Sequence, residues 1–304
     1  MSNFDLSALE LRQGSDDSAE GHRLLGVFLG LLIAGGVGNI VLLATAFLSS
    51  KVKRNVTWIN FCIVWVIFCA SYLILSFAGQ QTGPPPSHGL CLLQAVMVYG
   101  APPLATTATL ALATQLWFTL HQSIGDSSTT QPHHVHRRNL VLVIVPYIIY
   151  VVFLVESLVI GLSVPDRVVR ADSDVYCVVI SGLPGKISAF YVLMAMLATV
   201  ILEAFICRVI ARNWFKFRGV QKKGASLGVV VRVVAFTTFG VGVVATSLVF
   251  LTHVSNVIPN IFLAAMPLAA TLIFGTQMDI FQAWWIFRRT RNSSPPSDKL
   301  QMNA

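Results

Sequence analysis

Charge is scarce in this sequence. Asp, Glu, Lys and Arg make up 11% of its 304 residues, while 55% of the residues are hydrophobic. A soluble domain carries about 25% charged residues, so the composition excludes an ordinary soluble domain. Long runs contain no charged side chain at all, and residues 90–120 are one example. Such a run exceeds the roughly 20 apolar residues that cross a bilayer, and we therefore predict an all-α, polytopic membrane protein.

Several kinds of chemistry are missing from the apolar runs. None of them contains a lysine, which excludes a retinal pigment because its Schiff base needs a lysine inside a span. His, Asp and Glu are nearly absent from the runs, so an intramembrane metal hydrolase would have no set of ligands. His133, His134 and His136 cluster in a loop without nearby carboxylates, which favours a solvated loop. We expect no enzyme, no metal and no cofactor.

An internal repeat is also missing, and this counts against transporter folds that are built from a duplicated unit. Seven separate apolar runs are present instead, each long enough to cross a bilayer when tilt is allowed. We predict a seven-transmembrane helix bundle within residues 24–284. Its spans are residues 24–48, 56–78, 90–120, 140–163, 187–207, 233–251 and 257–278.

Basic residues are unevenly distributed between the two sets of connecting segments. One set holds sixteen Lys and Arg residues and the other holds five. The positive-inside rule then places the N-terminus outside and the C-terminus in the cytosol. Residues 1–23 form an extracellular polar tail without the features of a cleaved signal peptide, and residues 285–304 form a cytosolic tail. We expect a multi-pass plasma-membrane protein whose partners include membrane lipids but no nucleic acid.

The run at residues 90–120 carries two adjacent prolines, Pro102 and Pro103. A helix tolerates proline at membrane depth where neighbouring helices or hydroxyl groups satisfy the freed carbonyls. We therefore expect this helix in the middle of the bundle, the alternative being a merely kinked span. Cys91 at its outer end shares a compartment with Cys177, where thiols oxidise. We expect a disulfide between them rather than two unpaired thiols.

Seven spans, an outside N-terminus and the pair Cys91 and Cys177 together resemble the rhodopsin-like G-protein-coupled receptors. Gly38-Asn39 looks like the start of that family's Gly-Asn-x-x-Val, and an asparagine in a span favours an interhelical hydrogen bond. Residues 58–62 and 274–279 are similar to seven-helix receptor-like proteins of mushroom-forming fungi. The resemblance implies a receptor that senses an extracellular ligand and signals to a heterotrimeric G protein. A transporter or channel and a non-signalling seven-helix protein are the alternatives.

The segment after the last span also looks like that family. Residues 279–289 include Phe281, Trp284 and Trp285 followed by arginines, which resembles a short amphipathic helix on the inner leaflet. The alternative is an ordinary interfacial aromatic belt. Other positions depart from the family: Gln115-Leu116-Trp117 occupies the place of its Asp-Arg-Tyr, and the seventh span lacks its Asn and Tyr.

Glu156 is the one clear ionisable residue within a span, and such residues are functional candidates because charge is costly there. A hydrogen bond to a neighbouring helix is the alternative role. Helical spacing from Cys91 places Gln94, Val98 and Pro102 on one face with Tyr99 alongside. Residues of other spans lie at similar depth, and each of these candidates could instead serve packing. The candidate ligand-pocket residues are Gln94, Val98, Tyr99, Pro102, Glu156, Tyr191, Asn256 and Asn260.

A basic stretch follows the fifth span, where Lys and Arg alternate with Trp214, Phe215 and Phe217. It is consistent with a surface that contacts a G protein, and equally with a membrane-hugging amphipathic segment. The candidate cytosolic coupling surface consists of Arg208, Arg212, Lys216, Arg218, Lys222 and Lys223.

Overall fold

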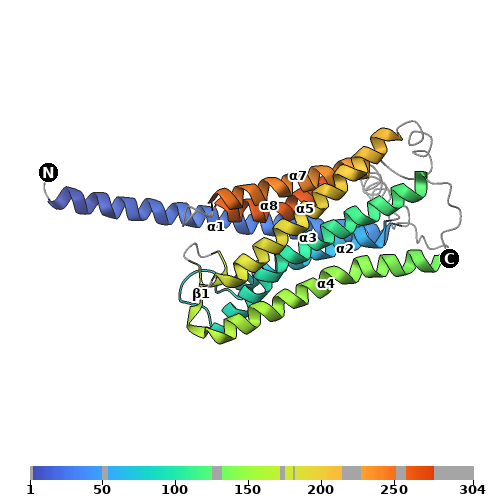
Figure 1. The fold of residues 1–304 in the computed structure, drawn as a ribbon. Helices are drawn as coiled ribbons and strands as arrows, with labels where there is room; N and C mark the ends of the chain where they lie inside the picture. The colour runs from blue at the N-terminus through green and yellow to red at the C-terminus, as the bar shows by residue number, and fades with distance from the viewer. Residues whose placement is uncertain are drawn as a thin grey trace, which may run out of the picture.

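The computed structural model describes residues 3–49, 54–124, 132–171, 175–180, 182–213, 227–250 and 258–276. Its helices lie side by side along one axis (Figure 1). They are α1 (Asn3–Leu48), α2 (Val56–Phe77), α3 (His88–Ile124), α4 (Pro132–Ser163), α5 (Leu183–Arg212), α7 (Leu227–Phe250) and α8 (Ile258–Gly275). Within the described residues, six helices are long and apolar enough to cross a membrane, and the last is a shorter apolar helix. These helices support a mostly helical, multi-pass membrane protein.

Helix α1 is longer than its apolar part. The apolar stretch covers Arg23–Leu48, but the helix begins at Asn3, and its first turns project beyond the other helices (Figure 1). Most of the polar residues before Arg23 are helical and continue α1, a helix extension that the sequence does not predict. No proline interrupts them, so the helical hydrogen bonds continue through this polar segment.

A small β-hairpin, which the sequence does not predict, covers one end of the bundle. After the turn η1 (Pro165–Arg167), strands β1 (Val168–Arg170) and β2 (Cys177–Val179) pair in antiparallel fashion. The hairpin packs on α3 and lies at the end from which α1 projects (Figure 1). We call this the hairpin end. The opposite end is called the basic end, because it carries Arg54, Arg137, Arg138, Arg208, Arg212 and Arg232.

Helix α3 occupies the middle of the bundle. It contacts α2, α4, α5, α7 and both strands of the hairpin. In the apolar stretch of α3, 61% of the residues are buried, against 17% for α4, which lies at the rim. The central position is the one that the two prolines of α3 predict.

A hydroxyl group of α5 satisfies the carbonyl of α3 that Pro103 leaves without a donor. Pro103 has no N–H to donate to the carbonyl of Tyr99, four residues earlier, and Ser188 Oγ of α5 donates to that carbonyl oxygen at 2.9 Å. Thr107 Oγ1 donates to the Pro103 carbonyl at 2.7 Å and lies 2.9 Å from the Tyr191 hydroxyl of α5. Two hydroxyl-mediated contacts therefore join α3 to α5 beside the prolines.

Helices α1 and α8 approach closely at two glycines. A Cβ atom at Gly35 would lie 2.6 Å from Pro267 Cβ, and one at Gly38 would overlap Thr271. This approach brings the fully buried Asn39 within reach of α8. Asn39 Nδ2 donates to the Pro267 carbonyl at 3.1 Å and to Thr271 Oγ1 at 2.9 Å. The interhelical hydrogen bonding that the sequence predicts for Asn39 is confirmed.

Candidate functional site

A disulfide and a buried amide attach the hairpin to the bundle. Cys91 of α3 and Cys177 of β2 form the disulfide that the sequence predicts, with their Cα atoms 5.3 Å apart. The fully buried Gln94 accepts at Oε1 from the Cys177 N–H at 2.9 Å, and its Nε2 donates to the Tyr72 carbonyl at 3.0 Å. The amide of Gln94, a predicted pocket residue, therefore holds β2 against α2 and α3.

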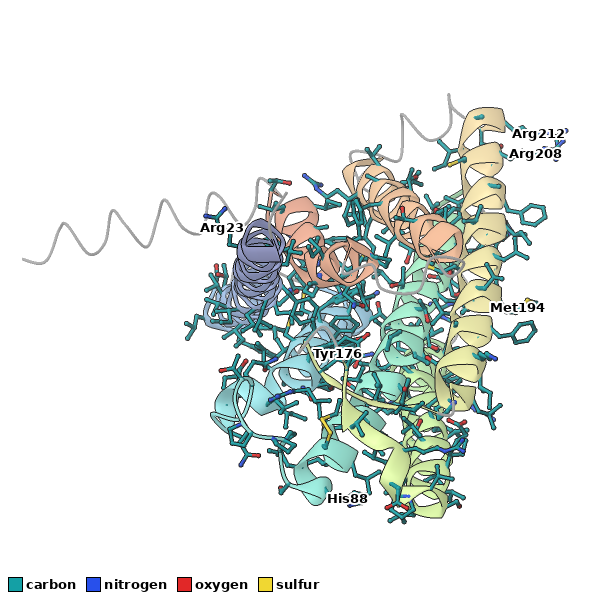
Figure 2. All side chains as sticks on the ribbon, turned by 90° about the vertical axis from the view of Figure 1, so that its left-hand side faces the viewer. Arg23, His88, Tyr176, Met194, Arg208 and Arg212 are labelled. Carbon is teal, nitrogen blue, oxygen red and sulfur yellow. A yellow bond between two sulfur atoms is a disulfide. The ribbon has the colours of Figure 1, made fainter. Side chains whose placement is uncertain are left out.

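Tyr176 lies near the middle of the bundle when the molecule is viewed from the hairpin end (Figure 2). Its ring packs edge-to-face on Tyr72, with centroids 5.3 Å apart, and lies 6.5 Å from the ring of Phe28. Its hydroxyl donates to Asn260 Oδ1 on α8 at 3.1 Å. Burial raises the pKa of Tyr176 to about 12 from its ordinary 10, so the phenol keeps its proton, and with it this hydrogen bond, further into the alkaline range. Tyr176 thus acts as a plug among α1, α2 and α8.

Aromatic rings continue from this plug through the bundle in an unbroken series. Neighbouring centroids are 4.9 to 6.0 Å apart, within the range of favourable ring contacts. The series leaves the hairpin, follows one face of α2 and ends on α7 and α8. We call it the aromatic column, and its members are Tyr176, Tyr72, Phe68, Trp65, Phe61, Phe236 and Phe274.

A cavity of about 30 Å³ lies beside the column. Apolar side chains form most of its wall, with Trp65 and Phe236 among them, together with Thr106, Thr109 and Thr237. All three threonine hydroxyls donate within the protein, those of Thr106 and Thr109 to carbonyls of their own helix and that of Thr237 to a carboxylate oxygen of α5. Water would find few polar partners in such a space. An occupant at this depth would therefore have to be apolar.

Glu156 of α4 has one carboxylate oxygen without a partner. Its Oε2 accepts from Ser157 Oγ at 3.1 Å, while Oε1 is buried with no hydrogen-bond partner among the described residues. A buried acceptor left unmatched costs about 1–3 kcal/mol. A ligand or a neighbouring helix that supplied a hydrogen-bond donor would remove that cost. The environment of Glu156 therefore fits either of its two predicted roles, ligand binding or an interhelical hydrogen bond.

The other predicted pocket residues have separate environments. Tyr99 accepts from the Val179 N–H at 3.1 Å and so binds β2 to α3. Tyr191 contacts Thr107 through its hydroxyl and packs on Phe153, with centroids 5.2 Å apart. Asn260 binds the plug. Val98 is buried in the core and Pro102 is half-buried, while Asn256 lies outside the described residues.

At the basic end, only part of the predicted coupling surface is described. Arg208 and Arg212 are exposed on the last turns of α5 (Figure 2). Where the resemblance would place Asp-Arg-Tyr, Trp117 stacks on His121 with centroids 4.5 Å apart. The segment at residues 279–289 lies outside the described residues, as do Lys216, Arg218, Lys222 and Lys223.

The aromatic column is not predicted from the sequence. Its part on α2 has a visible signal, because Phe61, Trp65, Phe68 and Tyr72 recur at spacings of four, three and four residues and so share one helix face. The plug has a weaker signal, since Tyr176 is only marked by its place beside Cys177. Nothing in the sequence says that this loop enters the bundle.

No protein-family model matches the chain, and no curated protein matches it. The class of membrane protein is therefore inferred from the fold and the site alone. The chain has the helices of a multi-pass membrane protein, and its own disulfide-linked hairpin covers one end of the bundle.

Proposed function

We propose that the chain is a seven-transmembrane receptor of the plasma membrane, which senses an extracellular ligand and signals to a heterotrimeric G protein. The aromatic column carries this proposal. It gives a continuous line of packed rings from Tyr176 at the hairpin end to Phe236 of α7 and Phe274 of α8. Chains of packed side chains can carry coupling between two distant sites, and the column joins the proposed ligand side to the proposed signalling side.

The proposed orientation has the hairpin end outside and the basic end in the cytosol. The arginines that define the basic end favour this orientation by the positive-inside rule. The disulfide between Cys91 and Cys177 favours it as well, because disulfides persist in oxidising compartments.

A ligand would act by replacing or moving the plug. Moving Tyr176 changes the packing of Tyr72, and the change can pass along the column to Phe236. Helix α7, which carries Phe236, packs less extensively than α3, and its hydrogen bond to α5 runs from Thr237 to Glu203 at 2.7 Å. A ligand that binds two positions of α7 unequally would shift the population between them.

A transporter or channel is less well supported by the described core. It would need a polar path along the bundle, yet the column is aromatic and the threonines of the cavity donate to the protein. Substrate flux in proteoliposomes would establish a transporter. A non-signalling seven-helix protein would show neither flux nor a ligand response.

The test is a ligand screen in a host cell that lacks receptors of its own, with G-protein activation as the readout. We expect one class of extracellular compound to activate the wild-type chain. Tyr176→Ala should raise the basal signal, and Phe236→Leu should reduce the response at equal surface expression. Phe190→Leu is the matched control because its ring is 67% exposed on α5, and it should respond like the wild type. If no ligand produces G-protein association, the coupling proposal is wrong.

A further inference from the structure

The basic end contains a groove that is separate from the aromatic column. It lies between α3 and α4 and has a volume of about 380 Å³. The guanidinium carbon of Arg138 lies 4.4 Å from the ring centroid of Phe118, which fixes that side chain against α3. Five residues line the groove: Phe118, Arg137, Arg138, Val141 and Leu142.

The two arginines of the groove have no carboxylate to pair with in the described part of the chain. The carboxylates whose side chains are described are Glu156, Asp166 and Glu203, and the acidic residues before Arg23 lie on the part of α1 that projects at the hairpin end. Glu156 and Asp166 lie toward the hairpin end, and Glu203 accepts from the Thr237 hydroxyl. In addition, Arg138 Nε is buried and has no hydrogen-bond partner among the residues that the structure describes. An anion with several oxygen atoms would supply the missing acceptors.

The groove lies where α4 changes from charged to apolar. From residue 140 onward the helix has no charged residue before Glu156. Arginine side chains at such a boundary lay their carbon stems along apolar surface and keep the guanidinium group among lipid headgroups. Val141 is exposed and Leu142 is half-buried, so an acyl chain can follow them into the bilayer. The groove thus offers cations at headgroup level and an apolar wall below them.

We propose that this groove binds one anionic phospholipid of the cytosolic leaflet. Arg137 and Arg138 hold its phosphate, because the guanidinium fork matches phosphate oxygens. Phe118, Val141 and Leu142 contact its glycerol backbone and the start of an acyl chain. The proposal shares the proposed membrane orientation with the receptor hypothesis, but it requires neither a ligand at the hairpin end nor a G protein.

The test counts bound lipid on the full-length protein in detergent by native mass spectrometry. We expect one phosphatidylserine to saturate per chain, with much weaker binding of phosphatidylcholine. The variant R137Q/R138Q should weaken phosphatidylserine binding about 30-fold, since each basic residue near an anionic lipid contributes about 5-fold. The matched control R208Q/R212Q removes the same charge from exposed sites at the same end, and it should change the affinity less than about 2-fold.

Two further measurements separate loss of lipid binding from misfolding and from binding of free phosphate. R137K/R138K keeps the charge but lacks the guanidinium fork, so its affinity should lie between those of the wild type and R137Q/R138Q. Binding by this variant would show that the loss in the glutamine variant does not come from misfolding. Inorganic phosphate at millimolar concentration should leave the lipid bound. If phosphate displaces the lipid, the groove binds free phosphate instead. Equal loss in the two double glutamine variants, or equal binding of the two lipids, would overturn the proposal.

Discussion

Helix α8 can lie against α1 because residue 35 has no side chain. In Gly35→Ala the new Cβ atom would lie 2.6 Å from Pro267 Cβ and 2.7 Å from the backbone nitrogen of Leu268. Non-bonded carbon atoms in van der Waals contact are about 3.5–4.0 Å apart. The contacted atoms belong to a proline ring and to the backbone, so no side chain can rotate away, and α8 itself must shift by about 1 Å.

The cost of Gly35→Ala has three parts. Overpacking of a close-packed core costs about 1–3 kcal/mol. The shift also weakens the hydrogen bonds from Asn39 to Pro267 and Thr271, which together contribute about 1 kcal/mol at the average of about 0.6 for such bonds in membranes. Alanine has a higher helix propensity than glycine, which stabilises the folded state by up to about 1 kcal/mol. We therefore expect the free energy of unfolding to fall by about 1–3 kcal/mol.

Gly30 on the same helix provides the matched control. A Cβ atom there would meet no atom of the described residues within 4 Å, so Gly30→Ala should leave the protein as stable as the wild type or slightly more stable. Equilibrium unfolding in mixed dodecylmaltoside and dodecyl sulfate, followed by circular dichroism, measures both variants. If Gly35→Ala proves as stable as Gly30→Ala, α1 and α8 do not approach each other as described.

Three other perturbations test the hairpin end. Cys91→Ser should lower the free energy of unfolding by about 2–5 kcal/mol, because the bridge closes a long loop; an unchanged unfolding curve would argue against the bridge. Ser188→Ala leaves the Tyr99 carbonyl without its donor and should cost about 1 kcal/mol, whereas Ser163→Ala, which loses an exposed bond within its own helix, should cost less than about 0.5 kcal/mol. Since burial raises the pKa of Tyr176 to about 12 from its ordinary 10, the folded state holds the phenol proton more tightly, and stability should fall as pH rises from 10 to 12. Absorbance at about 295 nm, compared with Tyr176→Phe, detects this titration, and ionisation at its ordinary pKa would contradict burial.

The helices are largely predictable from the sequence, but their ends are not. The run at residues 187–207 corresponds to α5, which extends from Leu183 to Arg212. Apolar runs mark the part of a helix that suits the bilayer, because lipid excludes charge. The backbone hydrogen bonds continue into the water beyond that part, until the chain meets a turn or a helix-breaking residue. For the same reason the polar residues before Arg23 continue α1.

The candidate site is only partly predictable, for a different reason. The disulfide and the hydrogen bonds of Asn39 follow from the chemistry of single residues and from the number of spans. The role of Gln94 cannot be predicted in this way. Helical spacing predicts the face of the helix on which Gln94 lies, but not the group that packs on that face. That group is the hairpin, whose strands have only three residues each. Such strands are too short for an alternating pattern to reveal them.

The plug and the column together constrain any ligand under the proposed function. A ligand that replaces Tyr176 must pack on Tyr72 and Phe28, which calls for a flat, apolar body. It must also meet the amide of Asn260, which loses a hydrogen bond when the tyrosine leaves. An amide can present either its oxygen or its nitrogen, so the ligand needs one polar group but not a particular kind. A purely apolar compound would leave this amide unmatched at a cost of about 1–3 kcal/mol, and should therefore bind about 5- to 150-fold more weakly than its phenol or amine analogue.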